Sequence, residues 1–206
     1  MSDALLALHY QNDICHPDGR IPFSLKRNTK DATHFVNASR RALQKARHAG
    51  WTIAHVHIAF AQDYSDLPRN CRLFLKTETL GALKRGSWGA AALAGFDPVH
   101  GEIVVTTNAN SAFRRTRLDG ALRKRGVTRI NVMGLATQFS VEHTVRDAAD
   151  IGYRVRLLAD CCASGDIDAH RASLRTLTML ADVTNSDQAL RTRRRSRSPG
   201  AAQREA

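Results

Sequence analysis

Short apolar runs of strand length alternate with amphipathic helical segments along most of this chain. The runs that read as strands cover residues 4–9, 52–58, 102–106, 129–133, 154–159 and 182–184. The segments with apolar residues at intervals of three and four, as in helices, cover residues 31–49, 111–124, 140–151 and 168–180. This alternation is typical of an α/β protein with a mainly parallel sheet. We therefore expect six strands in one such sheet.

The strand-to-helix junction near Ser140 is a candidate site. The β-branched run 129–133 leads to Gly134, and the next amphipathic pattern begins near Ser140. Backbone N–H groups at a helix N-terminus stabilise negative charge that develops beside them. Ser140 is thus well placed as a nucleophile, although serine is equally suited to a purely structural N-cap role.

Length and charge distribution indicate one domain followed by a basic tail. The chain has 206 residues, of which 43% are hydrophobic, and this is the size of a single domain. We assign that domain to residues 1–190. The formal net charge is +12, and the segment 191–206 holds six arginines with Glu205 as its only acid. Its composition predicts a disordered tail, with weak nucleic-acid binding as the alternative.

The sequence lacks the marks of a membrane, exported or metal-binding protein. No apolar stretch approaches the roughly 20 residues that span a bilayer, and the N-terminus has no export-signal pattern. We expect a cytoplasmic protein with no membrane segment. The four cysteines lack the paired spacing of a zinc site. His55 and His57 alternate along a strand and point to opposite faces, so we expect neither a metal nor a cofactor.

Five stretches of the chain form a recognisable set of motifs. They are LLALHYQNDI at 5–14, SAF at 111–113 with Thr116 and Leu118, VMGLATQFSVEHTVRDAAD at 132–150, GYRV at 152–155 with LAD at 158–160, and the segment 177–186. The set resembles the isochorismatase-like hydrolases, often called cysteine hydrolases, over roughly residues 3–190. The resemblance implies a three-layer Rossmann-like fold around a six-stranded sheet. It also implies a small-molecule substrate or ligand and assembly into dimers or tetramers.

The resemblance places the family's catalytic triad on three substituted positions. In the family, an Asp ends the first strand, a Lys precedes the Ser-Ala-Phe motif, and a Cys opens the helix after Gly-x-x-Thr. These positions hold His9, Thr107 and Ser140 here. Asp13 belongs to the Gln-Asn-Asp part of the motif and is not the missing acid. The cysteine mechanism therefore does not transfer to this chain.

A serine-histidine pair is our first hypothesis for the site. Family topology places the strands before His9 and Ser140 side by side, so both side chains are expected to face one pocket within hydrogen-bonding reach. A serine hydroxyl needs such a base to attack an amide, ester or related carbonyl. Backbone N–H groups of residues 137–140 are the expected oxyanion hole.

The pocket wall is expected to include Ala136, Thr137, Phe139, Trp88 and Phe113. By resemblance, a cis peptide bond is expected between residues 136 and 137. The long, irregular segment 60–101 is expected to border the pocket and subunit interfaces.

Thr107 cannot supply the charge of the family's lysine. The cations near it in sequence or on the adjacent loop are Arg114, Arg115, Lys84 and Arg85, and the sequence does not choose among them.

Two other readings remain open. In one, the protein cleaves a vinyl ether without a covalent step, and His9 donates the proton, because a histidine pKa near 6.5 suits acid or base work. In the other, the protein is catalytically inactive and acts as a ligand-binding or scaffold protein. His9 would then be a partly buried histidine at a strand end.

Overall fold

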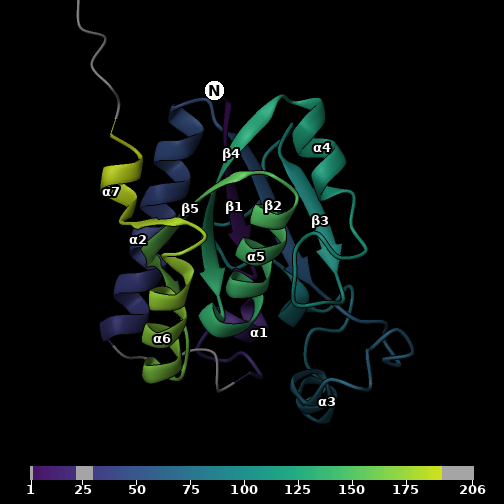
Figure 1. Ribbon diagram of the computed structural model, residues 1–206. Helices are drawn as coiled ribbons and strands as arrows, with labels where there is room; N and C mark the ends of the chain where they lie inside the picture. Colours follow the sequence, from purple (N-terminus) through teal and green to yellow (C-terminus); the bar gives the residue numbers. More distant parts are fainter. Residues whose placement is uncertain (1, 22–29, 192–206) are drawn as a thin grey trace, which may run out of the picture.

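The protein folds around a parallel six-stranded sheet (Figure 1). The computed structural model describes residues 2–21 and 30–191. The strands are β1 (Ser2–Leu8), β2 (Thr52–Ile58), β3 (Ile103–Thr107), β4 (Val127–Leu135), β5 (Arg154–Ala163) and β6 (Asp182–Thr184). They follow the order β3-β2-β1-β4-β5-β6, and every neighbouring pair is parallel. The predicted α/β fold is confirmed.

Helices connect the strands on both faces of the sheet. They are α1 (Asn12–Cys15), α2 (Lys30–His48), α3 (Arg72–Thr79), the 3-10 turn η1 (Trp88–Ala90), α4 (Leu118–Lys124), the π-helical turn η2 (Thr137–Val141), α5 (Glu142–Asp150), α6 (Ile167–Leu177) and α7 (Ser186–Ala189).

Two helix predictions were too long. The helix expected over 168–180 ends at Leu177. The helix expected over 111–124 begins only at Leu118, and residues 111–117 form turns. There the Thr116 hydroxyl donates to the Ala112 carbonyl, and the Ser111 hydroxyl accepts the Phe113 N–H. Such local side-chain bonds to the backbone compete with helix formation.

The residues of β1 alternate between two hydrophobic cores, which creates three layers. Leu5 and Ala7 belong to the core that contains residues of α2, including Leu43. Leu6 and Leu8 belong to the opposite core, which contains residues of α4 and α5. Because successive strand side chains point to opposite faces, one apolar strand supports a helical layer on each side.

The carboxyl ends of β1 and β4 lie next to each other. Their register pairs Leu8 with Gly134. Gly134 has φ +147, and an added Cβ there would lie 2.4 Å from the Leu8 carbonyl oxygen. Only glycine therefore allows the two strands to approach this closely. Parallel sheets bind ligands beyond such strand ends, so this edge is where a site is expected.

The expected basic tail, 191–206, lies outside the described residues except for Arg191. The assignment of the domain to residues 1–190 thus stays a prediction. Within the described ranges, no helix is both long and apolar enough to cross a membrane.

Candidate functional site

A small cavity of about 50 Å³ lies beyond the carboxyl ends of β1 and β4. Its polar lining residues include His9, Asn110 and Ser140. Most of the remaining wall is apolar, with Ile14, Ile21, Ile58, Leu83, Leu135 and Phe139 among its members. The cavity therefore brings His9 and Ser140 together from positions 131 residues apart in the sequence, as the alignment of motifs predicted.

His9 is a buried histidine whose ring has no hydrogen-bond partner among the described residues. It follows the last residue of β1, in the left-handed region with φ 61, and its backbone N–H donates to the Val56 carbonyl oxygen at 2.8 Å. Only 2% of the residue is exposed, and neither Nδ1 nor Nε2 is bonded within the described part of the chain. Burial, followed by the charge of His57, lowers the pKa of His9 to about 3. His9 is thus neutral at pH 7 and offers an unused donor and an unused acceptor.

Ser140 lies inside the π-helical turn η2, not at a helix N-cap. Its residue is 6% exposed, and its hydroxyl makes no hydrogen bond to any residue of the described ranges. The N-cap role considered for it is therefore wrong. The two side chains line the same cavity, but no hydrogen bond joins Ser140 to His9.

The loop before Ser140 supplies two of the expected wall residues. Ala136 and Phe139 line the cavity. The cis peptide bond joins Leu135 to Ala136, one residue before the expected position. The Ala136 carbonyl oxygen accepts the Phe139 N–H at 3.1 Å and the Val141 N–H at 3.3 Å. The Phe139 N–H, one of the expected oxyanion donors, is therefore engaged within the turn.

Thr137 is not among the residues that line the cavity, and it anchors this loop to α6. Its hydroxyl oxygen lies 2.8 Å from Nδ1 of His170. The Ser173 hydroxyl, also on α6, is 3.5 Å from the Thr137 carbonyl oxygen. Thr137 is thus a support for the loop and not part of the cavity wall.

Three other expected site residues also lie outside the cavity wall. The Thr107 hydroxyl donates to the Arg114 carbonyl at 3.2 Å and accepts the Ala109 N–H at 3.0 Å, so the backbone occupies it. Phe113 stacks on Tyr153 with ring centroids 6.1 Å apart. Trp88 is 53% exposed and meets His16 edge to face. None of the three is among the residues that line the cavity.

Three of the four candidate cations have partners. The Arg85 guanidinium is 2.8 Å from the Asp66 carboxylate, and the Arg114 guanidinium is 3.2 Å from that of Asp147. The Lys84 ammonium lies 5.1 Å from the centre of the Tyr64 ring. Arg115 makes no ion pair or side-chain hydrogen bond with the described residues.

The sequence reading missed Asn110 and the contribution of α3. Asn110 lines the cavity, and its Oδ1 is buried without a hydrogen-bond partner in the described structure. Its place directly before the Ser-Ala-Phe motif was the one available signal. Leu73, Phe74 and Thr77 of α3 form a further part of the wall, which agrees with the expectation that the segment 60–101 borders the pocket.

Asp13 is structural in this fold, and the cysteines form no disulfide. The Asp13 carboxylate accepts the backbone N–H groups of Arg20 and Leu83, at 3.2 and 2.7 Å. All four cysteines are free thiols. Within residues 2–21 and 30–191, no group of three or more His, Cys, Asp or Glu side chains is arranged to hold a metal ion.

Known proteins share both the motifs and the fold. Residues 3–188 match the isochorismatase domain. The ureidoacrylate amidohydrolase RutB of Methylobacterium radiotolerans is 40% identical over 93 residues, which are 45% of this chain and 36% of that protein. The chain spans little more than a third of the length of the first curated relatives it matches.

Two crystal structures extend the likeness over nearly the whole fold. An isochorismatase family protein from Desulfovibrio vulgaris has a TM-score of 0.79 and 28% identity, covering 91% of this chain and 96% of that one. A cysteine hydrolase from Pseudomonas syringae pv. phaseolicola has a TM-score of 0.80 and 25% identity, covering 92% and 91%. With the domain match over residues 3–188, these likenesses show that the chain belongs to the isochorismatase family.

Proposed function

We propose that the protein is a small-molecule hydrolase in which Ser140 attacks a carbonyl and His9 accepts its proton. One observation carries this proposal: the Ser140 hydroxyl and the neutral His9 imidazole line the same cavity, and the buried imidazole has no hydrogen-bond partner within the described ranges. Buried polar groups in folded proteins are nearly always hydrogen-bonded. An unpaired buried imidazole that faces the cavity beside a serine hydroxyl therefore favours a bound ligand that completes it.

An amide is the substrate bond that we favour. The relative from Methylobacterium radiotolerans is named for amide hydrolysis of ureidoacrylate. An amide also presents both a carbonyl acceptor and, when unsubstituted, N–H donors, which match the unused donor and acceptor of His9.

The proposed reaction proceeds in two steps. The Ser140 oxygen forms a bond to the carbonyl carbon while its proton moves to a ring nitrogen of His9. The carbon–nitrogen bond then breaks, and the same proton passes to the leaving amine. Water hydrolyses the acyl-serine in a second round, in which His9 takes a proton from the water and returns it to Ser140.

The low pKa of His9 limits this chemistry and ranks the alternatives. A neutral imidazole at pH 7 is ready to accept a proton, but burial makes its protonated form costly. Among the described residues, no carboxylate lines the cavity to stabilise that form, so we expect slow turnover compared with a complete triad. The same low pKa opposes the vinyl-ether reading, since His9 holds no extra proton to donate at neutral pH.

A ligand-binding role without catalysis is the second candidate. It is favoured by the absence of a hydrogen bond between His9 and Ser140 and by the engagement of the Phe139 N–H within its own turn. In that case the unpaired groups of the cavity bind a ligand but do not transform it.

A fluorophosphonate probe separates these two candidates. We expect stoichiometric labelling in intact-mass measurements, lost in Ser140→Ala and strongly reduced in His9→Ala. Ser39→Ala serves as a control, because Ser39 is also buried but accepts the Tyr10 hydroxyl away from the cavity. No labelling of the wild type, together with stabilisation by small amides without turnover, would favour the binding role.

A further inference from the structure

A second hollow adjoins the cavity and is far more polar. This outer groove has a volume of about 590 Å³, and its lining includes Asn110 and Phe74, which also line the cavity. Its charged lining residues are Arg114, Arg115 and Asp147. A ligand that extends out of the cavity past Asn110 therefore enters a groove that holds two cations and one anion.

Arg115 carries the uncompensated charge of the groove. Arg114 is paired with Asp147, so these two charges offset each other. Arg115 is exposed and has no ion pair within the described ranges. The net charge presented by these three residues is thus positive and resides on one guanidinium.

The backbone at Arg115 is in a conformation that favours glycine. Its φ is +58, and the left-handed region costs a non-glycine residue about 1–2 kcal/mol. Strained residues of this kind cluster at functional sites. An arginine at such a position, on the rim of a ligand-sized groove, is a second and independent indication that its side chain is used.

Asn110 stands at the junction between the two hollows. Its Oδ1 is buried without a partner in the described structure. The amide can present either its oxygen or its NH₂ group, because the two orientations are nearly the same in shape. It is therefore suited to bind the polar middle of a ligand that lies in both hollows.

We infer that the outer groove is a carboxylate subsite in which Arg115 binds an acid group of the substrate. This inference rests on the proposed function for the position of the scissile amide, which lies in the cavity at Ser140. The substrate class is a short carboxylic acid that carries an amide at its other end. Arg115 thus supplies a positive charge that Thr107 cannot supply. It acts at a different point of the substrate, where its planar guanidinium binds a carboxylate.

Calorimetric binding of matched acids and amides tests this assignment. The probes are succinamate, glutaramate and adipamate, each compared with its uncharged diamide. At least one acid should bind the wild type about tenfold more tightly than its diamide. Arg115→Gly should abolish that preference, and its fold should be retained because glycine suits the backbone at this position. Arg115→Lys should retain part of the preference, and higher ionic strength should weaken binding of the acid only.

Arg117→Gln is the matched control. Arg117 is an exposed arginine two residues away and does not line either hollow, so its loss should leave the preference for the acid unchanged. The inference is overturned if Arg115→Gly weakens binding of the acid and binding of the diamide equally, or if the wild type shows no preference for the acid. It is also overturned if none of these acids and diamides binds at concentrations up to about 10 mM, well above ordinary KM values.

The binding experiment and the labelling experiment fail independently. A preference for the acid that depends on Arg115, without labelling of Ser140, would retain the subsite and remove the proposed chemistry. Labelling of Ser140 without any preference for the acid would retain the chemistry and remove the subsite.

Discussion

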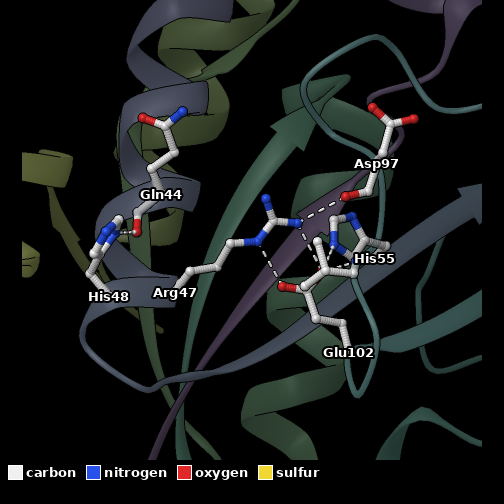
Figure 2. A network of polar contacts seen from close by, with 7 residues as sticks. Gln44, Arg47, His48, His55, Asp97 and Glu102 are labelled. Carbon is white, nitrogen blue, oxygen red and sulfur yellow. Dashed lines mark hydrogen bonds and ion pairs between the residues drawn. The ribbon is translucent and has the colours of Figure 1, made fainter.

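Glu102 is the centre of a buried charge network, and its replacement should destabilise the protein in a pH-dependent way. Figure 2 shows Arg47 of α2 and His55 of β2 directed at this carboxylate. Arg47 donates through Nε at 2.7 Å and Nη2 at 2.9 Å, and His55 lies at 2.8 Å. The Val99 N–H adds a further bond at 2.9 Å. The Glu102 side chain is only 7% exposed, so water replaces few of these bonds.

The size of the effect follows from the shifted pKa. Although burial opposes ionisation, the bonds from Arg47, Val99 and His55 outweigh it and lower the pKa of Glu102 from 4.5 to about 2. At 1.36 kcal/mol per pKa unit, ionised Glu102 contributes about 3 kcal/mol to the free energy of unfolding. This contribution is complete above pH 4.5 and is lost as the pH falls through 2. Glutamine has the shape of the protonated acid, so Glu102→Gln should cost about 3 kcal/mol at pH 7.

Urea denaturation followed by circular dichroism measures this difference. The gap between wild type and Glu102→Gln should stay constant from pH 7 to about pH 5 and should fall to roughly half near pH 3. Asp182→Asn is the control, because the Asp182 side chain is 64% exposed and its pair with Arg156 should contribute less than about 1 kcal/mol. A gap below about 1 kcal/mol at pH 7, or one that does not change down to pH 3, would refute the reasoning. Probe labelling of Ser140 should be unaffected, since Glu102 lies at the amino end of β3, whereas Ser140 lies beyond the carboxyl end of β4.

Three other predictions address the site and the assembly. Below pH 6.5 the wild type should lose up to about 1.4 kcal/mol of stability per pH unit, because the folded pKa of His9 is about 3 and only the unfolded chain binds the proton. His9→Asn should not show this loss. An unchanged slope of stability against pH in urea denaturation, between about pH 7 and pH 5, would contradict this. His170→Ala should speed amide hydrogen exchange in 137–141 and cost about 1 kcal/mol, whereas His48→Ala, which removes a comparable bond within α2, should leave that exchange unchanged. Light scattering should give the mass of a dimer or tetramer, and a monomer mass would disprove the proposed assembly.

Strand patterns were readable from the sequence because they are local. The runs 52–58 and 182–184 have the predicted bounds, and β4 and β5 extend further than their predicted runs. A strand in a buried parallel sheet is apolar over most of its length, so adjacent residues carry the signal. The turns at 111–117 were missed because hydroxyl bonds to the backbone, not the apolar period, determine the conformation there.

The sequence by itself determined the α/β fold and the family resemblance, and the resemblance implied the meeting of His9 with Ser140 at the carboxyl ends of two neighbouring strands. Only the tertiary structure decided which polar groups are left unpaired. Thr107, Thr137 and Phe139 were all expected at the site, but the first two use their hydroxyls and the third its N–H in other bonds. A residue's partners depend on loops brought together from distant parts of the chain, and so does the burial that lowers the pKa of His9. Hydrogen bonding and desolvation are properties of that assembled environment, and no local pattern of residues encodes them.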